Sequence, residues 1–273
     1  MPTGTLQQRQ EVPQLAVLEI DNLGIRFGGL QALDAVTFKA EEYEIVGLMG
    51  PNGAGKTTAF NIITGFYEPT TGTVTYRGRD ITSLRPDQRA ALGIGRTFQQ
   101  VGLVRTMTVL ENLLTAQHAR IRYSAGEGML GIPTSLVEER ALQRRAMEVL
   151  DFMGMAGLAH TRLAGLPYGT LKMVEASAVL ATDPDLLLLD EPSAGMSPEE
   201  SEDFGRLLLR IRSELGVTIV MIEHHVPMVV GVCDYIYVLN FGKLLAQGLP
   251  AEIQSHPEVI SAYFGEEDTY GVA

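Results

Sequence analysis

The sequence predicts an α/β fold with a mainly parallel sheet, and three apolar segments support this prediction. One apolar run, over 44–49, is followed by a glycine-rich turn and then by a helical pattern from residue 58. Two more unbroken runs, 186–189 and 217–222, flank a helical pattern over 198–214. Unbroken apolar runs are typical of strands buried on both faces of a parallel sheet. The order strand, helix, strand indicates a βαβ unit.

A second, smaller sheet is predicted beside this core. Residues 15–25 carry side chains that favour β structure and are expected to form the first strand. Residues 36–40 are its expected partner, and 72–78 resemble one arm of a hairpin. These segments together predict an antiparallel β subdomain.

The middle of the chain, from 85 to 181, has a largely helical pattern. It is clearest over 138–153, where apolar residues recur at helical spacing. Residues 123–134 are rich in glycine and are predicted to be a loop. Near the C-terminus, 235–239 and 243–246 are predicted to pair as a closing hairpin.

Composition limits the classes of function. The chain has 273 residues, of which 45% are hydrophobic, which suits one large α/β domain with a subdomain. Its net charge of -12 argues against a broad surface for the phosphate backbone of nucleic acid. Cys233 is the single cysteine, so no internal disulfide can form, and a reduced, cytosolic setting is expected.

No targeting or membrane-spanning segment is predicted. Residues 1–14 are polar and contain two prolines, so we expect a flexible N-terminal extension and no signal peptide. The longest apolar runs are strand-sized and far short of the roughly 20 residues that a spanning helix needs. If the protein works at a membrane, a partner must hold it there.

The glycine-rich turn carries the most specific chemistry. Residues 50–57 read Gly-Pro-Asn-Gly-Ala-Gly-Lys-Thr between a predicted strand and a predicted helix, which is the context of a P-loop. Backbone N–H groups of such a loop cradle phosphate oxygens, and the helix N-terminus adds positive charge. Lys56 is expected to reach the β- and γ-phosphates, and the Thr57 hydroxyl to hold Mg²⁺. The predicted nucleotide-binding residues are Gly50, Pro51, Asn52, Gly53, Ala54, Gly55, Lys56, Thr57 and Thr58.

The apolar run over 186–189 ends in two acidic residues, Asp190 and Glu191. A carboxylate at this strand end can reach the Mg²⁺ held by Thr57. The next carboxylate can accept a proton from an attacking water. We therefore predict that Asp190 is a metal ligand and Glu191 a general base.

With these motifs, the sequence resembles the ATP-binding subunit of an ABC transporter, and the likeness extends from about residue 15 to residue 265. Further segments indicate the branch within that superfamily: 27–30, 65–67, 96–99, 107–113, 166–169 and 257–265. In these segments the sequence is most similar to the ATPases of branched-chain amino-acid-type importers.

The resemblance implies a P-loop NTPase core with an antiparallel β subdomain and an inserted helical subdomain. Residues 15–273 would form a single ABC ATPase domain. Its core would span about 15–95 and 182–250, and its helical subdomain about 96–181. A C-terminal tail would cover about 251–273.

Further site residues are implied by the resemblance. Phe27 would stack on adenine, which an aromatic face can do at small cost. Gln99 would bind Mg²⁺ or the attacking water and sense the membrane partner, with Gln100 as its neighbouring alternative. His224 would contact the γ-phosphate and join Glu191, Gln99 and Lys56 in catalysis. His225 is adjacent to it, and the sequence alone does not separate the two.

Residues 166–170 occupy the place of the family's signature motif, which completes the ATP site of a facing subunit. The motif comprises Leu166, Pro167, Tyr168, Gly169 and Thr170. The family usually has serine at the second place and two glycines after it, and only Gly169 keeps its glycine. Ser197 stands where aspartate is often found. Because Pro-Tyr-Gly is similar to the motif of the branched-chain amino-acid branch, we interpret it as a working variant.

The implied function is ATP hydrolysis that energises a membrane transporter, an importer of branched-chain or related amino acids. The implied cofactors are ATP and Mg²⁺. The implied partners are integral membrane permease subunits, a second ABC ATPase subunit and, indirectly, an extracytoplasmic substrate-binding protein, with no nucleic acid. The chain would lie peripherally on the cytoplasmic face of the cell membrane.

Two alternatives stay open. Residues 167, 168 and 197 depart from the family pattern, which allows a non-hydrolysing nucleotide-binding partner in a heterodimer. A soluble ABC ATPase acting on nucleic acid or ribosomes is the other alternative. The net charge of -12, the single P-loop and the lack of sustained heptads count against it.

Overall fold

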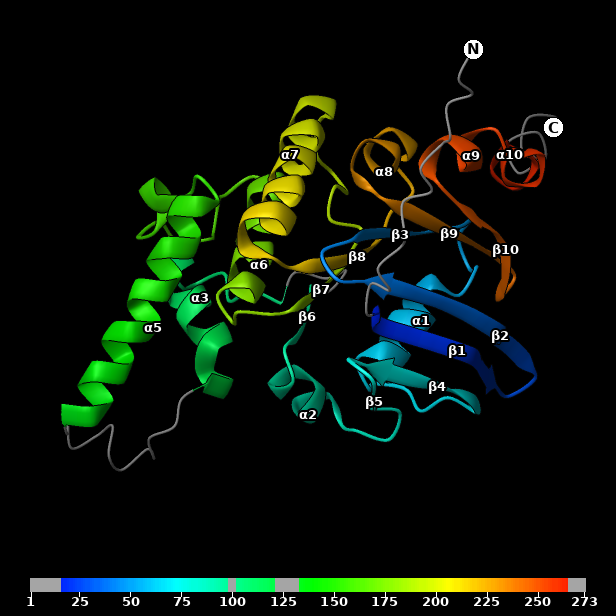
Figure 1. Cartoon of the computed structure of the whole chain (residues 1–273). Coiled ribbons are helices and arrows are strands. Elements are labelled where there is room, and N and C mark those ends of the chain that lie inside the picture. The colour runs from blue at the N-terminus through cyan, green and yellow to red at the C-terminus, as the bar shows by residue number, and fades with distance from the viewer. Residues whose placement is uncertain (1–15, 98–101, 121–132, 265–273) are drawn as a thin grey trace, which may run out of the picture.

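A mainly parallel sheet forms the centre of the molecule (Figure 1). The computed structural model describes residues 16–97, 102–120 and 133–264. The strands of this sheet are β3 (Ile45–Met49), β6 (Ile94–Arg96), β7 (Leu186–Asp190), β8 (Thr218–Ile222), β9 (Tyr235–Asn240) and β10 (Lys243–Gly248). Within the described residues their order is β10-β9-β3-β8-β7-β6, and every pair is parallel except β9 with β10. The predicted fold class is confirmed.

A second sheet is antiparallel and lies beside the first (Figure 1). It comprises β1 (Ala16–Phe27), β2 (Leu30–Glu41), β4 (Thr71–Tyr76) and β5 (Arg79–Asp80). The order of these strands is β2-β1-β4-β5. The pairings of β1 with β2 and of β1 with β4 confirm the antiparallel sheet expected from the sequence.

Helices cover both faces of the parallel sheet. Their bounds are α1 (Lys56–Ile63), α2 (Pro86–Ala91), α3 (Val109–Ala116), α5 (Pro133–Phe152), α6 (Tyr168–Leu180), α7 (Pro198–Leu215), α8 (Val226–Val232), α9 (Pro250–Gln254) and α10 (Pro257–Phe264), with short 3₁₀ helices η1 (Gln117–Arg120) and η2 (Ala156–Leu158). Helices α3, α5 and α6 contact one another and form a group away from the antiparallel sheet (Figure 1). None of the described helices has the length and hydrophobicity needed to cross a bilayer.

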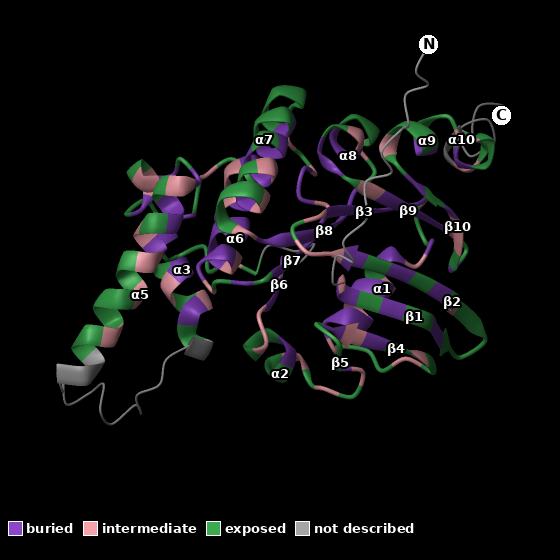
Figure 2. Ribbon diagram, viewed as in Figure 1, coloured by how far each residue is buried: buried purple, intermediate pink, exposed green. Residues whose placement is uncertain are grey.

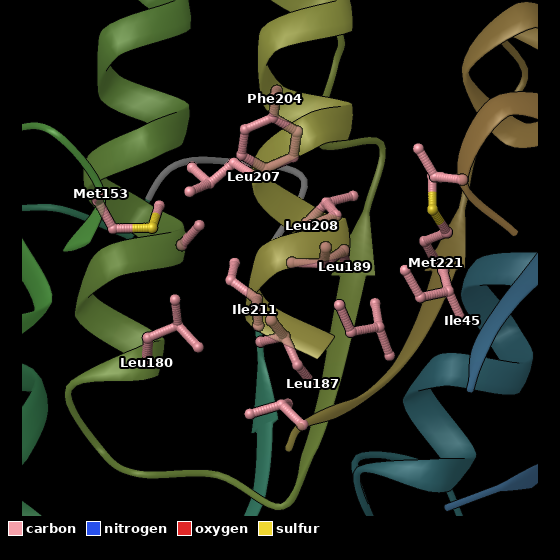
Figure 3. Packing of buried hydrophobic residues seen from close by; sticks show 14 of the residues in the cluster. Ile45, Met153, Leu180, Leu187, Leu189, Phe204, Leu207, Leu208, Ile211 and Met221 are labelled. Carbon is pink, nitrogen blue, oxygen red and sulfur yellow. The ribbon is translucent and has the colours of Figure 1, made fainter. Parts of the chain in front are cut away.

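The parallel strands are buried on both faces, as Figure 2 shows. On β7, Leu187 and Leu189 belong to a hydrophobic cluster with Phe204, Leu207 and other side chains of α7 (Figure 3). The alternate residues of β7 belong to a second cluster, which contains Phe60 of α1 and the inner face of the antiparallel sheet. Helix α1, which follows the glycine loop, is therefore fixed between the two sheets.

The structure differs from the sequence prediction at β6. Residues 94–96 lie in the stretch predicted to be largely helical, yet they pair in parallel with β7 at the edge of the sheet. A strand of three residues is too short to show a period of two in the sequence. Gly95 is needed there, because a Cβ at this position would lie 2.5 Å from a methyl carbon of Val179.

Most of the other predicted elements lie close to their expected bounds, but β2 begins at Leu30, well before the strand predicted over 36–40. The helix predicted over 138–153 is confirmed as α5, although it begins earlier, at Pro133. The predicted extension at 1–14, most of the predicted loop at 123–134, and residues 265–273 lie outside the described residues.

Candidate nucleotide-binding site

The glycine loop turns sharply between β3 and α1, and two of its glycines are required by close backbone contacts. Gly50 has a φ of 148°, and a Cβ there would lie 2.2 Å from the carbonyl oxygen of Leu239. Gly55, the N-cap of α1, has a φ of 102°, and its Cβ would lie 2.7 Å from the carbonyl oxygen of Ala32. Only glycine allows these approaches without strain. The loop is therefore held against β9 and β2 by its own glycines.

Lys56 opens helix α1 and is buried. Its ammonium group donates hydrogen bonds to the carbonyl oxygens of Gly50 (2.6 Å) and Pro51 (2.9 Å). Burial lowers the pKa of Lys56, and the carboxylates of Glu191 and Asp190 oppose that shift. The predicted phosphate contact thus lies inside the loop, where phosphate oxygens could replace the two carbonyl groups. Thr57 and Thr58 follow in the first turn of α1, exposed and half-buried respectively.

Asp190 ends β7 with its side chain almost fully buried. Its Oδ2 forms an ion pair with the guanidinium of Arg96 at 3.1 Å, and its backbone N–H donates to Thr97 Oγ1. Burial raises the pKa of Asp190, while Arg96 acts in the opposite direction. The buried Oδ1 has no hydrogen-bond partner among the described residues. One carboxylate oxygen is therefore fixed and the other is available as a ligand.

Arg96 connects this carboxylate to the helix that follows the glycine loop. Its Nη1 donates to Asn61 Oδ1 (2.8 Å) and Thr64 Oγ1 (3.0 Å), and its guanidinium lies 5.5 Å from the centre of the Phe60 ring. Arg96 was predicted only as part of a family motif, and this structural role was not predicted. An arginine directly after the apolar residues of a buried strand can be seen in the sequence. It indicates a buried ion pair, because a buried charge needs a partner.

Glu191 follows Asp190 in a left-handed backbone conformation, with a φ of 49°. Such a conformation is uncommon for a residue other than glycine and is often found at functional sites. The Glu191 N–H donates to the carbonyl oxygen of Ile222, at the end of the neighbouring strand β8. Its Oε1 lies 3.9 Å from Nδ1 of His224. Glu191 is the predicted general base and His224 the predicted γ-phosphate contact. The structure therefore brings these two side chains close together.

The neighbouring histidine faces a different element. Nδ1 of His225 lies 3.3 Å from Oγ of Ser201, in helix α7. His224 has an exposed side chain beside Glu191, whereas His225 is half-buried. The geometry favours His224 for the predicted role. Gln99 and Gln100, the two alternatives for the glutamine position, lie outside the described residues.

Phe27, the predicted adenine contact, ends β1 with 43% of its surface exposed. Its ring lies 5.2 Å from that of Tyr67, in an edge-on arrangement at 68°. Tyr67 is also exposed and was not predicted as a site residue. The exposure of Phe27 and its edge contact with Tyr67 are compatible with the predicted stacking of a base on the Phe27 ring.

The signature positions stand at the start of α6, where Pro167 is the N-cap and Tyr168 the first helical residue. The Tyr168 ring lies against Gly195, because a Cβ on that glycine would be 2.7 Å from ring atom Cδ1. Gly169 is buried next to Met196 and Glu200. The signature motif therefore rests on residues 195–200 of its own chain.

Ser197 has a structural role that was not predicted from the sequence. It is the N-cap of α7, and its hydroxyl accepts a hydrogen bond from the backbone N–H of Glu200 (3.2 Å). The Glu200 carboxylate accepts in return from the Ser197 N–H, which completes a capping box. Either serine or aspartate can serve at an N-cap. The departure from the family's aspartate is therefore compatible with an intact turn.

A glycine loop at a helix N-terminus, a buried lysine within it and a strand-end pair of carboxylates define a P-loop nucleotide-binding protein. The family model described as "ABC transporter" matches residues 33–194. A second model, described as "Branched-chain amino acid ATP-binding cassette transporter", matches residues 243–269. The chain belongs to the ABC transporter family and is an ATPase of that type.

Named relatives and solved structures agree with this assignment. The chain is 43% identical to the high-affinity branched-chain amino acid transport ATP-binding protein LivG of Salmonella typhimurium, over 92% of this chain and 98% of that protein. It is 41% identical, with the same coverage, to BraF of Pseudomonas aeruginosa, whose name is otherwise the same. A crystal structure of an ABC transporter cassette in its ADP conformation is 31% identical, with a TM-score of 0.80, and covers 92% of this chain and 99% of that one.

Proposed function

We propose that this chain hydrolyses ATP to drive the uptake of branched-chain or related amino acids through a membrane permease. The observation that carries this proposal is the near full-length similarity to LivG and BraF, both named as branched-chain amino acid transport ATP-binding proteins. The geometry of the site supports hydrolysis, because Lys56, Asp190, Glu191 and His224 are all present and converge on the carboxyl end of the parallel strands. Ligands of open α/β sheets bind at that end.

In the proposed reaction, water attacks the γ-phosphate in line with the leaving group. Glu191 accepts the proton of this water, and His224, 3.9 Å away, contacts the γ-phosphate and helps to orient the water. Lys56 exchanges its bonds to the loop carbonyls for bonds to the β- and γ-phosphates. Loop N–H groups and the start of α1 stabilise the developing negative charge.

The residues present fit a Mg²⁺ ion. Asp190 offers the buried Oδ1 that has no partner among the described residues, and Thr57, an exposed residue at the start of α1, offers its hydroxyl. Gln99 is the third proposed ligand. Magnesium prefers such oxygen ligands and keeps several waters and phosphate oxygens in its coordination sphere. When bound, the ion neutralises charge on the β- and γ-phosphates.

The proposed working unit is a dimer docked on a membrane permease at the cytoplasmic face. A cassette that is 26% identical to this chain, with a TM-score of 0.70, has been solved as a dimer in a post-hydrolysis state with ADP and Pi. In an equivalent arrangement, residues 166–170 of one subunit would complete the ATP site of the other. The N–H groups at the start of α6 would then face phosphate. The permease would dock near Gln99 and the helices of 96–181, and a substrate-binding protein would deliver cargo from outside.

The first experiment measures ATP turnover and oligomeric state for the native chain and for Glu191→Gln. The exposed Glu202→Gln is a matched control, since Glu202 lies outside the site on α7. We expect turnover in the native chain and the control, none in Glu191→Gln, and an ATP-dependent dimer of Glu191→Gln. Absence of turnover both alone and with the co-purified permease would contradict the hydrolytic function.

The second experiment concerns the cargo. Cells that lack this chain are expected to lose high-affinity uptake of labelled leucine, and the native chain should restore it where Lys56→Ala does not. If leucine uptake is unchanged and uptake of urea or a small amide is lost, the proposed class of cargo is wrong. The proposed ATPase function is not affected by that result.

A non-hydrolysing role in a heterodimer is the second candidate. It is motivated by Pro167, which lacks a backbone N–H and the usual serine hydroxyl, and by the bulky Tyr168. It predicts nucleotide binding without turnover by this chain in any assembly, and turnover only through a related second subunit.

A further inference from the structure

Glu223 is a buried carboxylate that has no role in the site described above. It directly follows β8 and is 1% exposed. Its Oε1 accepts hydrogen bonds from the backbone N–H of Ser193 (2.8 Å) and from the Ser193 hydroxyl (2.6 Å). Its Oε2 accepts from the backbone N–H groups of His224 (3.1 Å) and His225 (3.4 Å). One carboxylate thus joins two loops that come from different strands.

Both loops belong to the proposed catalytic region. Ser193 comes directly after the Asp190-Glu191-Pro192 segment and leads to Ser197, the N-cap of α7. The other loop carries His224, the proposed γ-phosphate contact. A second link joins the same elements, because Ser201 in α7 lies 3.3 Å from Nδ1 of His225.

The hydrogen bonds of Glu223 restrict the movement of the two loops relative to each other. A buried carboxylate is costly unless its oxygens are hydrogen-bonded, and hydrogen bonds to an ionised group are stronger than neutral ones. Among the described residues, no lysine or arginine forms an ion pair with Glu223, so the charge depends on the donors of the two loops. Moving one loop away from the other would leave an oxygen of this buried group unsatisfied.

The 193–197 segment also contacts the signature motif. Gly195 has a φ of 75° and leaves room for the Tyr168 ring, as its missing Cβ would be 2.7 Å from Tyr168 Cδ1. Contacts therefore run from His224 through Glu223 and Ser193 to the segment that supports Tyr168.

We propose that Glu223 is a positioning residue that couples the His224 loop to residues 193–197 and, through Gly195, to the signature motif. Occupation of the γ-phosphate position beside His224 then orders the 193–197 segment of the same chain. This inference rests on the proposed function, because it takes His224 to be the γ-phosphate contact.

The variants that test it are Glu223→Gln, Ser193→Ala and the double variant. An amide offers one acceptor oxygen, so its NH₂ group must face N–H donors of one loop and disrupt that side. Ser193→Ala removes only the hydroxyl donor and is the milder change. Glu44→Gln is the matched control, since Glu44 is a partly buried carboxylate that accepts a backbone N–H just before β3, at the end of the sheet opposite the site.

The kinetic readout separates positioning from binding. We expect Glu223→Gln to lower kcat about tenfold, the loss that corresponds to one hydrogen bond to a charged group, with KM for ATP within about twofold of native. The double variant should fall no further than Glu223→Gln, because both changes remove the same link. Native kcat in Glu223→Gln, or fully additive losses, would overturn the proposal.

Amide hydrogen exchange gives a readout that does not depend on turnover. With a non-hydrolysable ATP analogue, at a concentration where gel filtration shows a monomer, the native chain should gain protection at 50–57 and at 192–197. Glu223→Gln should keep the first gain and lose the second, and Glu44→Gln should keep both. Retained protection of 192–197 in Glu223→Gln would refute the coupling. Absence of protection at 50–57 in the native chain would instead contradict the proposed nucleotide site.

The nucleotide-free chain provides the remaining comparison. The observed bonds predict faster exchange at both 192–197 and 223–226 in Glu223→Gln, and a smaller increase in Ser193→Ala. Exchange equal to native at both segments would overturn the coupling whether or not nucleotide binds.

Discussion

The guanidinium of Arg96 lies 3.1 Å from the carboxylate of Asp190, with 5% and 1% of the two side chains exposed. This ion pair joins the edge strand β6 to β7. Through its bonds to Asn61 and Thr64, Arg96 also connects Asp190 to helix α1. The proposed metal ligand is thus held in place by the element that supports the phosphate loop.

Replacing Arg96 with methionine is expected to destabilise the fold. Breaking a buried ion pair by removing one partner typically costs about 3–5 kcal/mol, because the other charge stays buried without compensation. The measurement is the free energy of unfolding in urea. Arg206→Met is the control, since Arg206 pairs with Glu202 at an exposed site, where such pairs contribute about 0–1 kcal/mol. Equal losses in the free energy of unfolding of the two variants would show that the buried pair stabilises the fold no more than the exposed pair does.

Two glycines of the phosphate loop are expected to respond differently to alanine. Gly50→Ala places a Cβ 2.2 Å from the Leu239 carbonyl oxygen, so loop and strand must separate, and nucleotide binding should be lost. At Gly53 a Cβ meets nothing within 4 Å, and only the positive φ of 77° is unfavourable. That variant should keep binding and lose about 1–2 kcal/mol of stability. Fluorescent ATP titration and urea unfolding check both, and similar binding by the two variants would disprove the clash.

The Phe27–Tyr67 pair is expected to set affinity for the base. Stacking of a base on an aromatic side chain is worth about 1–3 kcal/mol, so Phe27→Ala should raise the Kd for ATP about tenfold. Tyr67→Ala should raise it less, about two- to fivefold, because it removes only the edge contact that orients Phe27. Tyr43→Ala, an exposed aromatic residue just before β3, serves as control. An unchanged Kd in Phe27→Ala would exclude the predicted stacking role.

Glu44 is expected to make stability depend on pH. Burial raises the pKa of Glu44, and Asp234 and Glu41 add to this shift. Between the unfolded pKa and the raised folded pKa, the folded state binds more protons than the unfolded state, so stability falls as pH rises through that window. Glu44→Gln removes this loss and should be more stable than native at pH 7, with a difference that shrinks below about pH 4.

The control for this prediction is Glu111, whose replacement is expected to change stability in the opposite direction. Hydrogen bonds from Thr108 lower the pKa of Glu111, so its ionised form stabilises the fold above the unfolded pKa. Glu111→Gln should therefore be less stable than native at pH 7, and its difference from native should also shrink in acid. Urea unfolding at pH 7 and below about pH 4 measures the free energy of unfolding of each variant. If Glu44→Gln and Glu111→Gln both gained or both lost stability relative to native at pH 7, these assignments would be contradicted.

The sequence alone determined the features that depend on neighbouring residues. The apolar run before residue 50, the glycines of 50–55 and the helical pattern after them are local, because each follows from backbone preferences within a few positions. The same holds for the apolar strands at 186–189 and 217–222 and for the acidic residues after the first of them. These patterns were sufficient to predict the fold class, the phosphate loop and the Asp190–Glu191 pair.

Only the tertiary structure decided the contacts between distant segments. Arg96 meets Asp190 across 94 positions, and Glu223 meets Ser193 across 30. Strand β6 is too short to show a period, and its place is set by pairing with β7. Such contacts have no local signature, because they arise where buried charges and unpaired backbone groups from different elements satisfy one another.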